Sequence, residues 1–251
     1  MGGRGATYKN YSGQMNIQVE DTLSEDSETE KQTAIVKQLK KRNVLVMAST
    51  DNIPDEILTP QLETIDKILS QTKLYPFMED KKLMIRTEKM GNHRIQACFW
   101  CKEVDFHHPQ IIYNKSIVNK TVEHIENSVK EQIKAKYWSN SDPQNYIKHT
   151  TAHEMGHLVQ RILTEKHAEK NAERGKRLLR GREYDRMFAD KMQKEVLRIA
   201  KEELNSSQKE ISLYGESSPY EFFAETYAEL ICSTKPTPLA QAMEIYLRRI
   251  E

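Results

Sequence analysis

Two histidines and a glutamate occur at the spacing HExxH within residues 150–159, where His153 and His157 flank Glu154. In an α-helix, residues four apart lie one turn apart on the same face, so the two imidazoles could hold one metal ion. Catalytic zinc sites use neutral imidazole ligands and leave one position for water, whose proton a neighbouring carboxylate can accept. The pattern predicts a Zn²⁺-dependent hydrolase, although five such letters also match by chance in ordinary helices.

A second stretch, YGESSPYEFFAETYAE at residues 214–229, places carboxylates at helical spacing. Pro219 suits the first turn of a helix and Ser218 suits its N-cap, so Glu221 and Glu225 would lie one turn apart on one face. A catalytic zinc needs a third protein ligand, and we assign this role to Glu221. Glu225 could accept a hydrogen bond from a metal-bound histidine and orient its ring. The alternative is an exposed acidic stripe on an ordinary amphipathic helix.

Together, HEMGH and YGESSPYEFFAETYAE resemble the motifs HExGH and YGxxxxxEFFAE of the gluzincin metallopeptidases of the anthrax lethal factor and Pro-Pro endopeptidase group. The similarity covers roughly residues 150–230. It implies a zincin-like domain in which His153, His157 and Glu221 bind zinc, Glu154 is the general base and Glu225 lies behind the metal ligands. The long charged connection between the two motifs departs from the group, which leaves the shape of the cleft and any lid open.

The resemblance also implies a role for Tyr214, seven residues before Glu221. The corresponding tyrosine of the group stabilises the oxyanion, and a phenol donor aimed at developing negative charge lowers the barrier. The residues alone do not favour Tyr214 over Tyr220 or Tyr227.

Other candidate ligands fit one metal ion less well. His149 lies one turn before His153, but three histidines on successive turns span about 12 Å, which is too long for one ion. We therefore interpret His149 as a residue of the cleft or as a packed core histidine. Cys98 and Cys101, with His107 and His108 nearby, suggest a second zinc site, but strand residues three apart point to opposite faces and chelate poorly.

The elements that must position these residues can be predicted from periodicity. Short extended runs at 83–86, 94–100 and 110–113 predict a small sheet, and the apolar run at 43–48 could be a strand that starts the folded part. A helical pattern occurs at 60–71, with Thr59 and Pro60 at its start, and another at 118–138. Two more helices are predicted, one from Pro143 through HExxH and one from Tyr184 onward. We expect an α+β zincin-like metallopeptidase fold, with a small mixed sheet, an HExxH helix and a helical C-terminal subdomain. Phe99, Trp100 or residues 111–113 could form the cleft edge along which an extended peptide binds, or simply pack in the sheet.

Composition divides the chain into an arm and one domain. Residues 1–42 combine a Gly-rich start with acidic and Lys-rich stretches and are predicted to form a mobile arm. Residues 43–251 would form the metallopeptidase domain. Within it, residues 164–183 are crowded with Lys and Arg around Gly175 and Gly181, which predicts an exposed connection. Its basic side chains form a solvated face or, alternatively, contact an acidic substrate or nucleic acid.

The charge balance indicates which classes of binding partner to expect. The chain has 251 residues, with 38 Lys and Arg against 37 Asp and Glu, so we expect no nucleic-acid or membrane partner but a protein or peptide substrate. The first residues lack the apolar stretch of a signal peptide, and the three cysteines cannot all pair within one chain. We therefore expect a cytoplasmic or phage-particle-associated protein, with secretion by another route left open.

Two alternative functions belong to other classes. A Gly-Gly-Arg-Gly start and a charged arm are also typical of some phage head-associated proteins, where a zincin domain would serve for processing or as a scaffold. An exported toxin-like protease is the second alternative, and the missing signal peptide counts against it.

Overall fold

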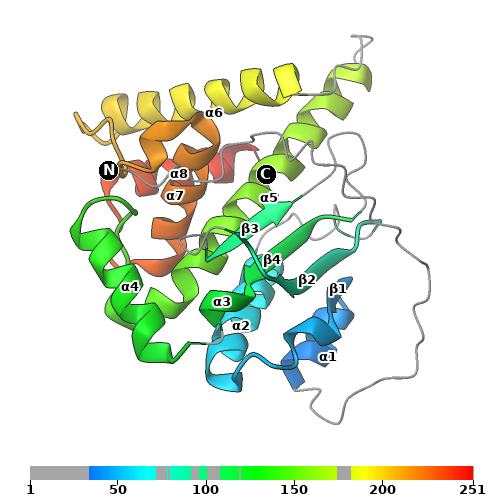
Figure 1. The fold of residues 1–251 in the computed structure, drawn as a ribbon. Coiled ribbons are helices and arrows are strands. Elements are labelled where there is room, and N and C mark those ends of the chain that lie inside the picture. The colour runs from blue at the N-terminus through cyan, green and yellow to red at the C-terminus, as the bar shows by residue number, and fades with distance from the viewer. Residues whose placement is uncertain are drawn as a thin grey trace.

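The computed structural model describes residues 34–71, 78, 80–91, 96–100, 108–118, 120–173 and 182–250. Within these ranges, helices surround a small mixed sheet of four strands, an α+β architecture (Figure 1). The strands are β1 (Val44–Val46), β2 (Leu83–Glu88), β3 (Ala97–Trp100) and β4 (Gln110–Asn114). The α-helices are α1 (Ala34–Lys40), α2 (Asp55–Gln71), α3 (Lys115–Val118), α4 (Val122–Lys134), α5 (Tyr146–Glu173), α6 (Arg182–Glu202), α7 (Pro219–Cys232) and α8 (Pro238–Ile250). Short 3-10 turns occur at η1 (Ala48–Thr50), η3 (Pro143–Asn145) and η4 (Gly215–Ser217).

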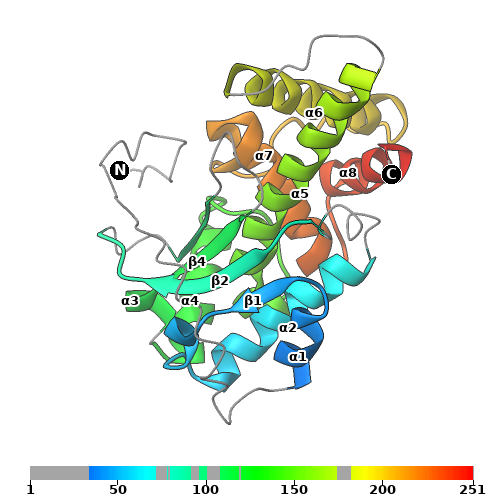
Figure 2. The same cartoon turned by 90° about the vertical axis from the view of Figure 1, so that its right-hand side faces the viewer.

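The sheet has the strand order β1-β2-β4-β3, so β3 forms one of its edges. The three strands β1, β2 and β4 run parallel, and β3 runs antiparallel to β4. All five residues of β4 are buried, while β2 alternates buried and half-buried residues. The edge strand β3 lies against α5, which brings the open side of the sheet next to the HExxH residues (Figures 1 and 2).

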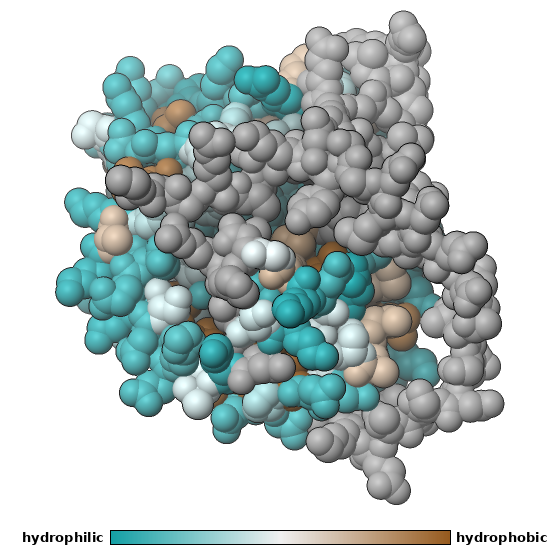
Figure 3. Space-filling model, in the orientation of Figure 1, coloured by the Kyte–Doolittle hydropathy of each residue, from teal (hydrophilic) through white to brown (hydrophobic). Residues whose placement is uncertain are grey.

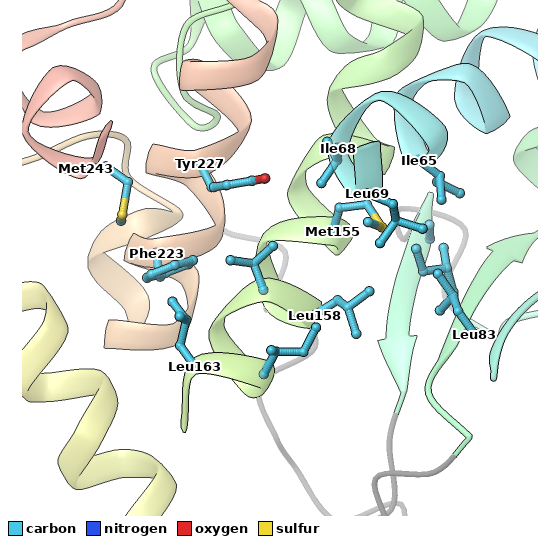
Figure 4. Packing of buried hydrophobic residues seen from close by; sticks show 14 of the residues in the cluster. Ile65, Ile68, Leu69, Leu83, Met155, Leu158, Leu163, Phe223, Tyr227 and Met243 are labelled. Carbon is cyan, nitrogen blue, oxygen red and sulfur yellow. The ribbon is translucent and has the colours of Figure 1, made fainter. Parts of the chain in front are cut away.

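Helix α5 lies between the sheet and α2 on one side and α7 on the other (Figures 1 and 2). Apolar side chains of α2, β2, α5, α7 and α8 meet around it (Figure 4). Met155 and Leu158 on α5 and Phe223 on α7 are among the most buried. Burial of each side chain of this size stabilises the fold by about 1.5–3 kcal/mol. The metal-motif helix is therefore held on two sides by packed core.

Helices α5 and α7 approach closely at Gly156, the glycine of the HEMGH motif. A Cβ atom added to Gly156 would lie 2.9 Å from the Cα of Ala224. Only glycine leaves room for the two backbones at this distance. Glu221 and Glu225 are thereby brought close to the histidines of α5.

Most predicted elements are confirmed, but α2 begins earlier than expected. Pro60 lies inside α2 and not at its first turn, because the helix already starts at Asp55. Asp55 and Glu56 occupy the first turn, where negative charge is favourable, and Ile57 is buried against the core. The packing of this extra turn outweighs the backbone hydrogen bond that proline cannot donate.

Two expected boundaries also differ. Residues 34–40, expected in the arm, form α1, which packs on α2 through the buried Leu39. Residues 164–173, expected in an exposed connection, are the last turns of α5, where Thr164 and Ala168 are buried. Residues 1–33 and 174–181 lie outside the described residues.

The described surface reflects the charged composition. On the face shown in Figure 3, the described residues are mainly hydrophilic and the hydrophobic ones are scattered. Among the described helices, none is both long and apolar enough to cross a membrane.

Candidate metal centre

His153, His157 and Glu221 converge at one point between α5 and α7. Nε2 of His153 and Nε2 of His157 lie 3.2 and 3.3 Å from Oε2 of Glu221. Among the described residues, these three form a group whose ligand atoms all lie within 4.8 Å of one another, close enough to hold a metal ion. The three predicted ligands are therefore brought together.

Local sequence explains how Glu221 reaches the histidines. Ser218 caps α7, with its hydroxyl accepting a hydrogen bond from the Glu221 N–H at 3.2 Å, and Pro219 occupies the first turn. Both features were predicted from the sequence. Glu221 is thus fixed in the first turn of α7. Burial by itself would raise the pKa of this carboxyl, but the adjacent His157 and His153 bring the pKa well below its ordinary value.

Glu225 lies one turn further along α7 and contacts Nδ1 of His153, the ring nitrogen that faces away from Glu221. Its Oε1 lies 2.8 Å from Nδ1 of His153. Its Oε2 accepts hydrogen bonds from the backbone N–H of Ser139 at 2.5 Å and from the hydroxyl of Ser212 at 3.0 Å. A histidine that donates from Nδ1 presents the Nε2 lone pair, which is the form that binds a metal. Glu225 therefore occupies the position predicted for it.

Glu154 lies beside the two histidines and is almost fully buried. The backbone N–H of Phe99 on β3 donates a hydrogen bond to its Oε2 at 2.6 Å. Burial raises the pKa of Glu154 above its ordinary value, and the charges of His153 and His157 partly oppose this rise. A carboxyl group with a raised pKa is a better proton acceptor and donor near neutral pH than an ordinary one.

Tyr214 precedes η4, and its ring stacks on that of His153. Its ring lies 5.6 Å from that of His153, with 21° between the planes. Burial and the negative charges of Glu221 and Glu154 raise the pKa of its phenol, which keeps the hydroxyl protonated. It can therefore act as a hydrogen-bond donor beside the metal ligands. Tyr227, which the residues alone did not exclude, is buried in the core against Phe223.

The open edge of β3 faces the metal centre. In the antiparallel pair with β4, the Asn114 N–H donates to Gln96 O, and Cys98 lies opposite Ile112. The alternation of such a ladder turns the backbone groups of Ala97 and Phe99 away from β4. The bond from the Phe99 N–H to Glu154 agrees with this direction.

Other sequence-predicted candidates lie outside the cluster. His149 is buried and stacks on Trp138 at 5.3 Å between ring centroids, and burial lowers its pKa to about 4. Cys98 is a free thiol whose pKa is raised to about 12 by burial and by the charge of Glu154. Cys101 and His107 lie outside the described residues, so the second zinc site stays a hypothesis.

A hollow of about 1230 Å³ between α5, α6 and α8 contains none of the candidate site residues. Cationic side chains, including Lys170, Lys191 and Lys194, line it together with the exposed Met187 and Ile250. It is separate from the metal centre.

Sequence reasoning missed the segment Lys136–Asn140 and Glu229. The sequence predicts a helix that continues to Trp138, but α4 ends at Lys134, and nothing in residues 135–140 indicates that the Ser139 N–H reaches Glu225. Glu229 is buried on α7 one turn beyond Glu225, and its Oε1 accepts a hydrogen bond from the Thr237 N–H at 2.7 Å. The only available signal was the continuing four-residue spacing of Glu221, Glu225 and Glu229.

The centre thus combines two imidazoles and a carboxylate with a buried acid and a phenol donor. No family model, curated protein or solved structure matches this chain. What the protein does must therefore be inferred from the chemistry of these side chains.

Proposed function

We propose that this protein is a zinc-dependent metalloendopeptidase with a zincin-like fold, of the gluzincin type that its two motifs resemble. The observation that carries the proposal is the convergence of His153, His157 and Glu221, whose ligand atoms lie within 4.8 Å of one another. Glu154 lies beside them with its carboxylate held by β3. The arrival of a third possible ligand from another helix at the same point supports a metal site over a chance match to five letters.

The donor set favours zinc over other metals. Two imidazole nitrogens and one carboxylate oxygen are the protein ligands of many catalytic zinc sites, while Mg²⁺ and Ca²⁺ prefer oxygen ligands alone. A bound zinc ion would supply Lewis acidity and lower the pKa of water. Glu225 and the Ser139 N–H support this assignment because they fix the ring of His153 from behind.

Glu154 and Tyr214 would perform the proton transfer and the charge stabilisation. The Glu154 carboxylate takes the proton from the attacking water and then gives it to the nitrogen of the leaving amine. The Tyr214 hydroxyl donates a hydrogen bond to the peptide carbonyl oxygen as negative charge develops on it. Because Tyr214 stacks on His153, its phenol is held close to the ligands where this charge would form.

An extended peptide is the substrate that the site accommodates best. The outward N–H and carbonyl of Ala97 and the outward carbonyl of Phe99 on the edge strand β3 can pair with the backbone of such a peptide, while the Phe99 N–H bonds to Glu154. Since Phe99 also holds Glu154, a peptide on this edge would lie directly beside the proton acceptor. We therefore propose that β3 forms the cleft edge along which the peptide binds, rather than only packing in the sheet.

The test is a peptide-library cleavage profile of the zinc-loaded full chain beside Glu154→Gln. We expect the wild type to cleave a defined set of peptides and the variant to lose at least about a hundredfold in rate, because general-base catalysis contributes roughly that much. Equal zinc content in both proteins, measured by mass spectrometry, shows that the substitution spared the metal site. Cleavage that persists in Glu154→Gln would refute the proposed role.

A further inference from the structure

Tyr137 stacks on Tyr214, which in turn stacks on the proposed metal ligand His153. Its ring lies 5.5 Å from that of Tyr214, with 21° between the planes. The ring of Tyr214 in turn lies 5.6 Å from that of His153. The ring of Tyr214 thus stacks with two other rings, those of Tyr137 and His153.

The backbone carbonyls of Lys136 and Tyr137 also hold residues 213–214 in place. The carbonyl of Lys136 accepts a hydrogen bond from the Leu213 N–H at 2.9 Å, and the carbonyl of Tyr137 accepts one from the Tyr214 N–H at 3.0 Å. Lys136 has φ 55°, a left-handed conformation directly after the C-cap Ala135 of α4. This is the usual way to turn a chain at a helix end. The turn presents the carbonyls and the ring of Tyr137 to residues 213–214.

The same segment also bonds to Glu225, the residue that contacts Nδ1 of His153. Two residues after Tyr137, the Ser139 N–H donates to Glu225, whose other oxygen lies 2.8 Å from Nδ1 of His153. Residues 137–139 thus contact both Tyr214 and Glu225, two of the residues that contact His153. Tyr137 is half-buried, so its ring covers Tyr214 without belonging to the core.

We propose that Tyr137 is a positioning residue, which holds the phenol of Tyr214 in the direction that the peptide carbonyl oxygen requires. The proposal rests on the proposed peptidase function. Tyr214 belongs to a turn and not to a long helix, so its side-chain direction depends on its hydrogen bond to Glu221 and on the two rings that stack with it. Without the ring at 137, Tyr214 would lose one of these two stacking partners, and the phenol would be held less firmly in direction.

The role predicted for Tyr137 depends on its ring. Tyr137→Phe keeps the stack, and Tyr137→Ala removes it. We expect Tyr137→Ala to lower kcat about five- to tenfold, as the strength of an aromatic pair suggests, with KM and zinc content unchanged. Tyr137→Phe should keep most of the wild-type kcat. Tyr146→Ala is the matched control, because Tyr146 is half-buried as well and takes part in none of the ring stacks of the described residues.

A second readout does not depend on activity. In the zinc-free full chain, 3-fluorotyrosine at position 214 reports the ring current of its neighbour through its ¹⁹F chemical shift. We expect Tyr137→Ala to change this shift and broaden the signal, while Tyr137→Phe and Tyr146→Ala leave it near the wild-type position. An unchanged ¹⁹F signal in Tyr137→Ala would show that the stack does not hold Tyr214 and would overturn the proposal.

The kinetic outcomes separate the two claims. A wild-type chain that cleaves no peptide in the presence of zinc contradicts the peptidase function itself. In an active wild type, unchanged kcat in Tyr137→Ala contradicts only the positioning role. A raised KM with unchanged kcat does so as well, because it would place Tyr137 in contact with the substrate.

Discussion

Oε1 of Glu225 lies 2.8 Å from Nδ1 of His153, on the side of the imidazole that faces away from Glu221. Glu225 is 1% exposed, and burial by itself would raise its pKa. The hydrogen bond to His153 and the charge of that histidine lower this pKa below its ordinary value instead. The contact between Glu225 and His153 therefore links the buried face of α7 to the proposed metal site.

Removal of the Glu225 carboxylate should weaken zinc binding without removing a ligand. We expect Glu225→Ala to bind zinc about 10–100-fold more weakly, the usual cost of losing a group that orients a metal-bound histidine. Competition against a chromophoric chelator measures the affinity. Glu216→Gln, at an exposed position nearby, should bind zinc as the wild type does. An affinity for zinc that is the same in Glu225→Ala and wild type would contradict this role.

The phenol of Tyr214 should contribute to the rate and not to metal binding. We expect Tyr214→Phe to lower kcat about 10²–10³-fold, the cost of removing one oxyanion donor, with unchanged zinc content. Tyr227→Phe should keep kcat within about twofold, since Tyr227 lies in the core. Steady-state kinetics on the best library peptide measures both variants. A larger loss of kcat in Tyr227→Phe than in Tyr214→Phe would show that the donor was wrongly assigned.

Gly156 should not tolerate a side chain even though it lies in a helix. Alanine usually stabilises an exposed helix relative to glycine by about 1 kcal/mol. Here the added Cβ would lie 2.9 Å from the Cα of Ala224, so we expect Gly156→Ala to lower the free energy of unfolding by about 1–3 kcal/mol. Urea unfolding measures this change. Gly91→Ala is the control, because its Cβ would meet nothing within 4 Å. A stability at or above wild type in Gly156→Ala would mean that the two helices are further apart.

Glu229 should make stability fall with rising pH. Burial raises the pKa of this carboxyl from 4.5 to about 7. The folded state therefore binds a proton more readily than the unfolded state between these pH values, and stability decreases as pH rises through this window. Glu229→Gln keeps an acceptor for the Thr237 N–H but cannot ionise. We expect its melting temperature to exceed that of the wild type at pH 8 and to match it near pH 4.5. A difference in melting temperature that is the same at both pH values would contradict this account.

Local rules predict where His153, His157 and Glu221 lie on their own helices, whereas the meeting of the two helices depends on the close packing at Gly156. Four-residue spacing sets His153 against His157, and the cap at Ser218 sets where α7 begins and hence where Glu221 points. Tyr214 could be chosen only through the resemblance to known peptidases. The structure places its ring on His153, a contact that no local pattern predicts.

The remaining features depend on contacts between distant parts of the chain. Ser139 and Glu225 are 86 residues apart, and no periodicity relates a turn to a carboxylate at that separation. Likewise, the earlier start of α2 follows from the burial of Ile57 in the core, which outweighs the local signal of Pro60. Helix α1 is part of the fold because Leu39 packs on α2, although its sequence is as charged as that of the predicted arm.

Reconstitution with zinc tests the central claim most directly. The full chain is stripped with a chelator, zinc is added back in steps, and the cleavage rate of one library peptide is followed together with bound zinc. We predict that the rate rises linearly and levels off at one equivalent of zinc per chain. Glu154→Gln should bind the same one equivalent and stay inactive, and His157→Ala should bind zinc weakly. A wild-type chain that binds no stoichiometric zinc, or a cleavage rate that is independent of zinc, would contradict the proposed function.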